Sequence, residues 1–372
     1  MKILYIIESL THGGKERRLV SLIKEFKERD NVQIEIIILS TDIHYKEIFD
    51  FNIKIHLLKR NIKKDLGIFS KFNRILKKFN PDIVHCWDNI AAFHFGPICK
   101  IKRIPFVNSM ISTAPPKKLL KTFSKRFILN AVSYPFSDVI LANCNAGLDS
   151  FRVPKNKGKC IYNGFDLGRN KVNLSPKEIR EKFNIKTKYV VGMTGGFYIR
   201  KDYQSFVNGA NLVLKNRNDV TFVAVGDGPN LEKIKKFVKS DNKENFKFVG
   251  KQLDVDSIVN IFDVGILTSN MDYHGEGISN SLMEFMFFSK PTIATDGGGT
   301  SELIINNETG FLIEPKSEDQ LAEKIEYLLE NQERALQMGK KGRERIETHF
   351  SIDRMIEEFF QLYTELLKLK RK

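Results

Sequence analysis

The sequence predicts an α/β fold made of two doubly wound domains that face a central cleft. The chain has 372 residues, more than the roughly 250 to 300 at which one hydrophobic core stops growing. Short continuous apolar runs recur, each followed by sequence of helical periodicity, which is typical of parallel strands buried on both faces. This rhythm restarts after the polar stretch at residues 164–178, where we place the domain boundary.

The expected strands of the first domain, residues 1–166, are KILYII, VQIEIIIL, DIVHCW, IPFVNSM and SDVILAN. Those of the second domain, residues 167–350, are YVVGMTG, VTFVAVG, FKFVG, DVGILTS and PTIATD. Residues 351–372 have apolar positions at helical spacing and predict a terminal helix that completes the first domain. Ligands are expected at the carboxyl ends of the strands in each domain.

Charge and composition narrow the possible partners. Sixty Lys and Arg against 45 Asp and Glu give a net charge of +15, which favours a nucleotide, a phospholipid surface or nucleic acid. A genome-wide compositional bias would give the same charge. Because no recognised nucleic-acid-binding motif is present, we expect no nucleic-acid partner.

The cysteine pattern and the absence of a long apolar run bear on localisation. The four cysteines show no Cys-x-x-Cys spacing, which indicates reduced cytosolic thiols. No segment approaches the roughly 20 uninterrupted apolar residues of a bilayer span. We therefore expect a cytoplasmic protein, either soluble or peripheral on the inner face of the cytoplasmic membrane.

The strongest motif is HGEGISNSLMEFMFFSKPTIATDGGGTSEL, from His274 to Leu303. A helix is expected to begin near Ser279, which places Glu276 in the preceding loop and Glu284 inside the helix. Carboxylates suit hydroxyl donors rather than phosphate, so we expect Glu276 to bind a sugar and Glu284 a ribose. The alternative is that both are solvated charges, but the apolar neighbours of Glu284 argue that its carboxylate has a partner.

The start of the same helix is a candidate anion site. The backbone amides of Ile278, Ser279 and Asn280 are expected to point outward, where the helix dipole also favours negative charge. Gly277 would let a ligand come close to the backbone. A diphosphate fits this position, so the whole motif matches the length of a sugar-diphosphate-ribose ligand.

Two glycines follow the first expected strand. Gly13 and Gly14 lie between KILYII and an amphipathic helix, where a ligand can approach the backbone. The alternative is a tight strand-to-helix turn with no ligand. The dinucleotide fingerprint G-x-G-x-x-G is absent, which disfavours a nicotinamide enzyme.

The glutamate motif EGISNSLMEFMFFSKPTIATDGGG resembles the signature of glycosyltransferase family 4, a large retaining family of GT-B fold with two Rossmann-like domains. Other segments resemble further parts of that family and occur in its order along the chain. They are HGGKERRL, IYNGFD, GGFYIRKDYQSF, VAVGDGPN, FKFVG and TSELIINNETGFLIEP.

The resemblance implies roles for individual residues. It implies that Lys201 grips the donor phosphates, that Glu276 contacts the donor sugar and that Glu284 contacts the ribose. The family often has an arginine where this chain has Gly196, so Arg200 is the candidate for the second positive charge. On this basis Glu276, Lys201 and Arg200 are the expected catalytic residues.

The resemblance also implies an activity. We expect a retaining transferase that moves a sugar from a nucleotide-diphosphate sugar, UDP-linked, to a glycan or polyprenyl-linked acceptor in surface polysaccharide biosynthesis. Two alternatives remain open, a catalytically degenerate nucleotide-sugar-binding homologue and a GT-B nucleotide-sugar epimerase. Asp254 and Asp256 match a D-x-D pattern that can hold a metal ion. They precede an apolar run of helical spacing, however, and acidic residues in that position more often cap a helix. We therefore expect no cofactor and no metal.

Two features of the first domain stay open. Many family members carry a histidine near the strand IPFVNSM, and the candidates here are His12, His85 and His94, although His85 suits a packing role equally well. Residues 115–132 predict a basic amphipathic helix, which would rest either on an anionic membrane or on the core.

Overall fold

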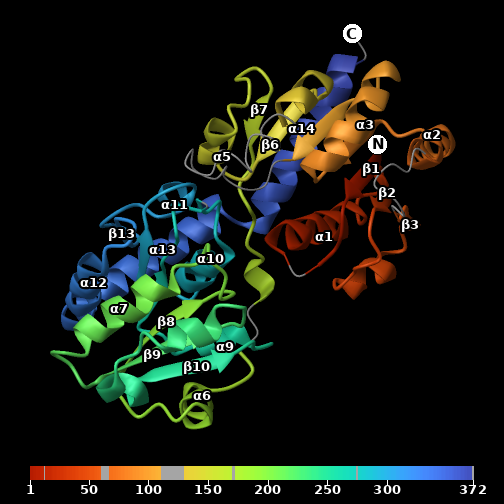
Figure 1. Cartoon of the computed structure of the whole chain (residues 1–372). Helices are drawn as coiled ribbons and strands as arrows, with labels where there is room; N and C mark the ends of the chain where they lie inside the picture. Colours follow the sequence, from red (N-terminus) through yellow and green to blue (C-terminus); the bar gives the residue numbers. More distant parts are fainter. Residues whose placement is uncertain (12, 60–66, 110–129, 170–171, 274, 371–372) are drawn as a thin grey trace. The chain divides into compact units, whose positions relative to one another are not determined.

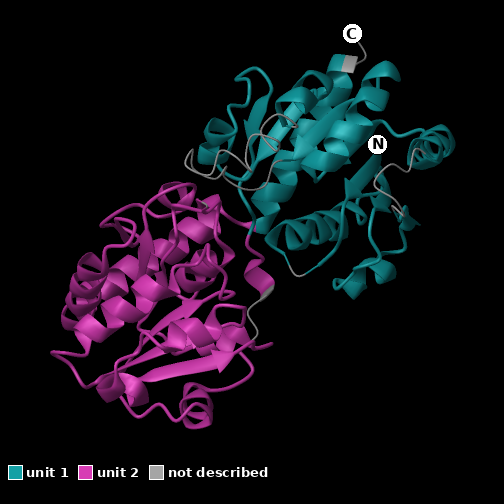
Figure 2. Ribbon diagram, in the orientation of Figure 1, with its two compact units in different colours: residues 1–113, 119–164, 352–372 teal, residues 114–118, 165–351 magenta. Residues whose placement is uncertain are grey.

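The computed structural model describes the chain except for residues 12, 60–66, 110–129, 170–171, 274 and 371–372 (Figure 1). The chain divides into two compact units (Figure 2). The first contains the described residues up to Gly164 together with the segment that begins at Ile352, and the second contains Phe165–Ser351. The sequence placed this boundary after residue 166. Each unit is described by itself.

The first unit is built on a parallel sheet. Its strands in the described part of the chain are β1 (Lys2–Ile7), β2 (Gln33–Ile38), β3 (Lys54–Leu57), β4 (Ile83–Cys86), β5 (Phe106–Ser109), β6 (Val139–Ala142) and β7 (Gly158–Cys160). They lie in the order β3-β2-β1-β4-β5-β6-β7. Its helices are α1 (Gly14–Phe26), α2 (Gly67–Phe79), α3 (Asn89–Ile101), α5 (Asn145–Ser150) and α14 (Ile352–Lys370), with short 3-10 turns at Lys46–Phe51 and Tyr134–Phe136.

Helices cover both faces of this sheet, as the continuous apolar strands predicted. Side chains of β1 alternate between the two faces: Ile3, Tyr5 and Ile7 pack in one core with α1 and α14. Leu4 and Ile6 pack in the other core with α2 and α3. The apolar face predicted for the last helix is therefore confirmed, and α14, blue in Figure 1, belongs to the first unit.

His85 is a packing residue in the middle of this unit. It lies on β4 with no exposed surface, and its ring nitrogens lie 2.6 Å from the hydroxyls of Tyr363 and Ser109. A neutral imidazole can satisfy both hydroxyls, because it donates with one nitrogen and accepts with the other. Burial, and then the charge of Arg18, hold the pKa of His85 well below its ordinary 6.5. The structure thus gives His85 a structural role.

The second unit has its own parallel sheet. Its strands in the described residues are β8 (Tyr189–Thr194), β9 (Val220–Val225), β10 (Phe246–Gly250), β11 (Val264–Leu267), β12 (Thr292–Thr295) and β13 (Phe311–Ile313), in the order β10-β9-β8-β11-β12-β13. Its helices are α6 (Pro176–Lys182), α7 (Tyr203–Val213), α8 (Leu231–Lys235), α9 (Val255–Asn260), α10 (Asn280–Phe287), α11 (Thr300–Leu303), α12 (Glu318–Glu330) and α13 (Gln332–His349). Short 3-10 turns lie at Leu167–Arg169 and Ser240–Asn245.

Three strands were absent from the sequence prediction, namely β3, β7 and β13. Each lies at an edge of its sheet, where one side of the strand has no neighbour. Their sequences KIHL, GKC and FLI are short, and the first two carry half-buried or exposed residues. KIHL and GKC therefore lack the continuous apolar run that marks the central strands, and FLI is only three residues long.

Each sheet has one point at which the strand order reverses direction. In the first unit it lies between β1 and β4, and in the second between β8 and β11. Doubly wound sheets bind ligands beyond the carboxyl ends of the strands at this switch point. The two switch points are therefore the candidate ligand-binding sites.

The structure bears on only one of the two predictions about the membrane, the absence of a spanning helix. Within the described residues, no helix has both the length and the apolar character to cross a bilayer. Nearly all of the basic segment 115–132, and also His12, fall outside the described residues.

Candidate functional site

The loops that follow β8 and β11 are joined by hydrogen bonds at the switch point of the second unit. The Asp202 N–H donates to the Thr268 carbonyl at 3.1 Å, and the Thr268 hydroxyl donates back to the Asp202 carbonyl at 2.7 Å. The Asn270 N–H donates to the Arg200 carbonyl at 2.9 Å. These contacts hold the two loops in one register.

Lys201 and Glu276 meet across this junction. The Lys201 Nζ lies 2.7 Å from Oε1 of Glu276, and the side chains are only 11% and 18% exposed. The Ser269 hydroxyl donates to the same Oε1 at 3.2 Å. No described residue donates to the second oxygen, Oε2. An ion pair thus fixes a carboxylate that keeps one oxygen open.

The protonation state of Glu276 follows from this pairing. Burial, the largest single effect, would raise the pKa of its carboxyl, but the charge and hydrogen bond of Lys201, the charge of Arg200 and the hydrogen bond of Ser269 together outweigh it. The pKa therefore lies below its ordinary 4.5. At neutral pH Glu276 is an ionised hydrogen-bond acceptor.

The glycine turn after β12 supports the backbone of Glu276. Gly299 N–H donates to the Glu276 carbonyl at 2.7 Å. Gly298 adopts φ +60°, and a Cβ there would lie 2.1 Å from the same carbonyl oxygen. Only glycine fits this left-handed, crowded position. The DGGG sequence was part of the predicted motif, but the sequence did not reveal this role.

Arg200 is an exposed residue of the loop after β8, next to Lys201 in the sequence. Its guanidinium carbon is 5.9 Å from the centroid of the Tyr198 ring. That ring also covers Gly196, because a Cβ at Gly196 would lie 2.7 Å from it. The position where the family resemblance led us to expect an arginine thus lies beneath the exposed Tyr198 ring. Arg200 is near enough for its charge to lower the pKa of Glu276.

The predicted helix start at Ser279 is confirmed, since α10 begins at Asn280 with Ser279 as its N-cap. The Ser279 side chain makes no capping hydrogen bond. The Ser281 hydroxyl donates to the carbonyl of Thr194 at 3.0 Å, which ties the helix to the end of β8. Glu284 lies on the same helix and is 7% exposed, so it is buried rather than solvated.

Two neighbouring polar residues escaped the sequence prediction. Ser269 follows β11 and bonds to Glu276. Thr194 ends β8, and its buried hydroxyl has no hydrogen-bond partner among the described residues. Single hydroxyl residues after strands are too common to be recognised from sequence; only the strand order brings these two to the site.

The structure does not bring every predicted residue into this unit. Gly13 and Gly14 lie in the first unit, where Gly13 is the N-cap of α1 and Gly14 its first residue. A Cβ at Gly13 would lie 1.9 Å from the Glu16 carboxylate. That carboxylate is the end of a flexible side chain that can move aside, so this contact does not by itself require glycine there. Gly277 and Ile278 lie in the loop directly before α10, as expected.

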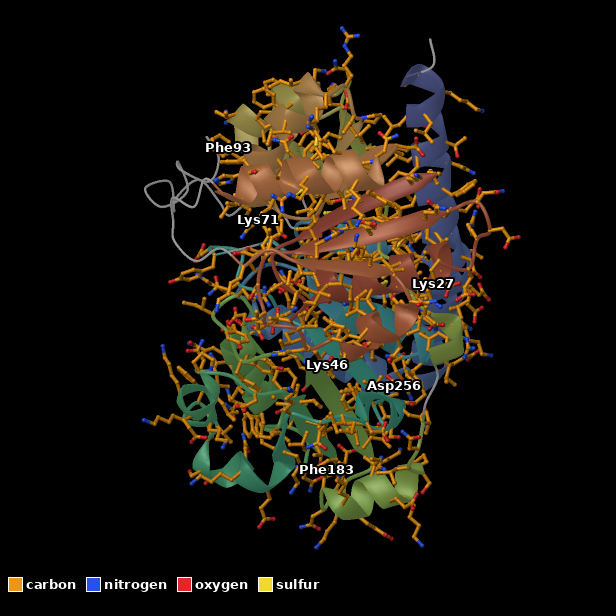
Figure 3. The ribbon with its side chains drawn as sticks, turned by 90° about the vertical axis from the view of Figure 1, so that its right-hand side faces the viewer. Lys27, Lys46, Lys71, Phe93, Phe183 and Asp256 are labelled. Carbon is orange, nitrogen blue, oxygen red and sulfur yellow. The ribbon has the colours of Figure 1, made fainter. Side chains whose placement is uncertain are left out.

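Asp254 acts as a helix cap, as preferred from sequence. Its carboxylate accepts hydrogen bonds from the Ser257 N–H at 3.0 Å and the Ser257 hydroxyl at 2.7 Å. Asp256, labelled in Figure 3, lies in the first turn of the same helix α9. No group of three metal-ligating side chains occurs within the described residues.

Two family models match the chain, one in each unit. The model for glycosyl transferases group 1 matches residues 175–345, and that for glycosyltransferase family 4 matches residues 12–169. Together they leave only short segments uncovered. The chain therefore belongs to the family-4 glycosyltransferases, and the predicted family is confirmed.

Individual relatives are distant. The chain is 29% identical to the poly(ribitol-phosphate) α-N-acetylglucosaminyltransferase of Staphylococcus aureus over 52% of this chain and 38% of that protein. It is 25% identical to an Escherichia coli UDP-Gal:α-D-GlcNAc-diphosphoundecaprenol α-1,3-galactosyltransferase, over 83% and 82% of the two chains. The chain spans about half the length, or less, of the first curated relatives it matches.

A solved structure confirms the fold. Anabaena HepE in complex with UDP-glucose superposes with a TM-score of 0.84 at 20% identity, covering 98% of this chain and all of that one. The fold is GT-B, with two Rossmann-like units, as the sequence predicted. Identity at this level carries the fold and nothing further.

Proposed function

We propose that the chain is a retaining glycosyltransferase that takes a sugar from a UDP-sugar and transfers it to a glycan or lipid-linked acceptor in surface polysaccharide biosynthesis. In this proposal the second unit binds the donor and the first unit binds the acceptor. The donor site is the switch point formed by Lys201, Glu276 and α10.

The observation that carries the proposal is the open oxygen of Glu276. Its Oε1 is occupied by Lys201 and Ser269, which leaves Oε2 to accept a hydrogen bond from a sugar hydroxyl. Lys201 still has donors to spare, because an ammonium carries three N–H groups and only one is used by Glu276. The same lysine can therefore hold the carboxylate and a phosphate together.

The remaining groups suit a diphosphate. The amino end of α10 offers backbone N–H groups and the positive end of a helix dipole. Arg200 adds an exposed positive charge beside the pair. Glu284, buried on α10, is the proposed ribose contact. Gly13 and Gly14 remain proposed donor contacts from the first unit.

The proposed reaction needs no protein nucleophile. The bond between the sugar C1 and the diphosphate oxygen breaks while the acceptor oxygen bonds to C1 from the same face, and the acceptor proton passes to the leaving phosphate. Lys201, Arg200 and the start of α10 stabilise the growing negative charge. Because these groups carry the charge, we propose that no metal is required, so a chelator should leave turnover unchanged.

Related proteins support the choice of nucleotide and acceptor. The Anabaena structure holds UDP-glucose, and the E. coli relative is named for UDP-galactose and a diphosphoundecaprenol-linked sugar. A lipid-linked acceptor would place the enzyme at the inner face of the cytoplasmic membrane, and we propose peripheral attachment there.

The test is a panel of UDP-, GDP-, ADP- and CMP-sugars, followed by thermal stabilisation and by slow hydrolysis of the sugar-phosphate bond. We expect UDP-sugars to give the largest responses, and Glu276→Gln and Glu284→Gln each to weaken them. Glu181→Gln is the matched control, because its side chain on α6 is 67% exposed. Unchanged binding in both site variants would sink the site assignment, and stabilisation without turnover on any acceptor would indicate a degenerate homologue.

A further inference from the structure

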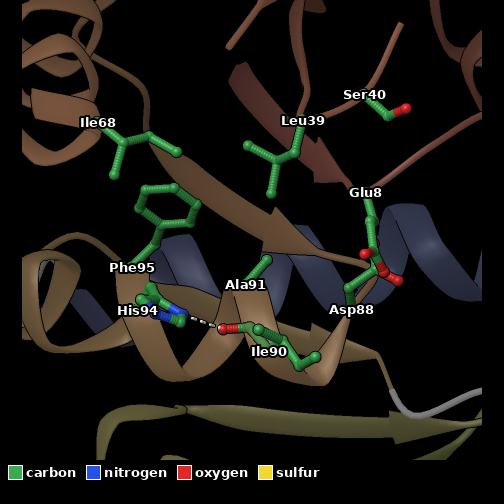
Figure 4. A pocket seen from close by; sticks show the side chains of 9 residues that line it. All are labelled: Glu8, Leu39, Ser40, Ile68, Asp88, Ile90, Ala91, His94 and Phe95. Carbon is green, nitrogen blue, oxygen red and sulfur yellow. Dashed lines mark hydrogen bonds between the residues drawn. The ribbon is translucent and has the colours of Figure 1, made fainter. Parts of the chain in front are cut away.

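The switch point of the first unit also has a pocket, of about 250 Å³. Figure 4 shows Glu8 and Asp88 at one end and Ile68 and Phe95 at the other. The nine lining residues are Glu8, Leu39, Ser40, Ile68, Asp88, Ile90, Ala91, His94 and Phe95. They come from the ends of β1, β2 and β4 and from helices α2 and α3.

Asp88 is already engaged by the protein. One of its oxygens accepts the backbone N–H of Glu8, and the other is paired with Lys15. Lys15 also lies 3.6 Å from Glu16. Burial alone would lower the pKa of Lys15, but Asp88, Glu16 and Glu8 together raise it. The positive charge of Lys15 is therefore more than balanced before any ligand arrives.

Glu8 remains open to a ligand. Its side chain is exposed, and no described residue donates a hydrogen bond to its carboxylate. Ser40 beside it accepts the Asp42 N–H at 3.1 Å, which leaves its hydroxyl hydrogen to be donated elsewhere. The polar end of the pocket thus offers one anionic acceptor and one neutral hydroxyl.

The rest of the pocket is apolar, with Leu39, Ile68, Ile90, Ala91 and Phe95 forming its wall. None of the nine lining residues is a lysine or an arginine. His94 uses Nδ1–H to donate to the Ile90 carbonyl at 2.6 Å, and its ring stacks on Phe69. The volume is below the roughly 300 to 1,000 Å³ of drug-sized ligand pockets, which suits a single ring.

We propose that this pocket binds one sugar ring of the acceptor. That ring carries hydroxyl or amino groups and no anionic group, and Glu8 is the residue that determines this specificity. An apolar wall suits the C–H face of a pyranose, and Glu8 accepts hydrogen bonds from its hydroxyls. A carboxylate or phosphate on that ring would face Glu8 with no lysine or arginine among the lining residues, and like charges at short range are costly. The inference rests on the proposed function and adds the substrate class of the first unit.

The test uses p-nitrophenyl glycosides of glucose, galactose and mannose, each paired with its uronic acid, and the full chain at low salt. Binding is followed by saturation-transfer NMR and by competition. We expect at least one neutral glycoside to bind about tenfold or more tightly than its uronic acid, because the uronic acid loses a hydrogen bond to Glu8 and its carboxylate is repelled by it. Glu8→Gln should reduce this preference to about threefold or less.

Two further variants locate the binding. Ile90→Trp should fill the pocket and abolish glycoside binding without unfolding, because Ile90 is already 43% exposed. Glu47→Gln is the matched control, an exposed glutamate of the same unit that does not line the pocket. UDP binding is measured on each variant in parallel and should not change, which keeps a failure of this inference distinct from a failure of the donor site.

Three results would overturn the proposal. They are equal or tighter binding of the uronic acids by the unmodified protein, a preference that Glu8→Gln leaves intact, and no binding of any of the six glycosides. If the unmodified protein does not bind UDP, that result would instead overturn the proposed function.

Discussion

The two switch points of this molecule share a topology and differ in charge. Each places a lysine against a carboxylate, Lys15 with Asp88 in the first unit and Lys201 with Glu276 in the second. The additional charge beside the pair is acidic in the first unit, where it is Glu8, and basic in the second, where it is Arg200. The two units thus have the same fold and a candidate ligand site at the same position, but the additional charge at that site has the opposite sign. This difference suits an uncharged acceptor at one site and an anionic donor at the other.

The largest expected effect tests the basic site. Lys201→Met keeps an unbranched side chain, one atom shorter, but removes the charge that neutralises the leaving diphosphate and holds Glu276. We expect UDP-sugar turnover to fall by about 100- to 1,000-fold, the usual cost of losing one group that stabilises the transition state. Turnover is measured as UDP release.

Lys186→Met is the control for that change, since Lys186 is exposed and lies outside the site. A loss of less than about fivefold in Lys201→Met would break the comparison, because the basic site would then not serve the donor.

Gly298→Ala tests how the second unit holds its carboxylate. The change forces a side chain into a left-handed position against the Glu276 carbonyl. We expect it to cost about 3 kcal/mol of unfolding free energy, measured by denaturant titration, and to weaken UDP-sugar binding.

Gly250→Ala separates strain from contact. Gly250 also has a positive φ, +68°, but a Cβ there would meet nothing within 4 Å. It should cost only about 1 kcal/mol. Equal losses in the two variants would show that close support of Glu276 is unimportant.

His85→Phe tests whether the buried histidine of the first unit is neutral in the folded protein. His85 is neutral when folded, because its pKa is lowered from the ordinary 6.5. The unfolded chain therefore binds one more proton below about pH 6.5, and acidification destabilises the folded protein by up to about 1.4 kcal/mol per pH unit through this residue.

The variant should lack that contribution, so its stability relative to the unmodified protein should improve as pH falls from 7 to 5. At pH 7 it should be less stable by about 1–3 kcal/mol, because the buried hydroxyls of Tyr363 and Ser109 each lose the hydrogen bond to His85. A difference that stays constant with pH would contradict the neutral state of His85.

Arg200→Ala is expected to have the smallest effect. Its guanidinium is exposed and acts on the donor from outside the buried pair, so we expect UDP-sugar affinity to fall about three- to tenfold at low salt. The difference should shrink toward 1 M salt, where charges are screened over about 3 Å. An effect as large and as salt-independent as that of Lys201→Met would place Arg200 in the site itself.

The sequence predicted the architecture because the central strands are buried on both faces, and burial leaves a continuous apolar run such as YVVGMT in β8. It missed β3, β7 and β13, which are edge strands of only three or four residues. The start of α10 near Ser279 was predictable because a helix start has local chemical requirements.

Contacts between loops were not predictable in the same way. Lys201 and Glu276 are 75 residues apart, and their pairing depends on β8 and β11 being neighbours. The same holds for Ser269, and for Gly298, whose close approach to Glu276 exists only after β12 has joined the sheet. The pocket of Glu8 and Asp88 likewise requires β1 and β4 to be adjacent.

The most direct test of the division between the two switch points is calorimetric titration of UDP into the unmodified protein, Lys201→Met and Glu8→Gln under identical conditions. We expect UDP binding to be lost, or weakened by about tenfold or more, in Lys201→Met and to be unchanged in Glu8→Gln. Full UDP affinity in Lys201→Met, or its loss in Glu8→Gln, would contradict it.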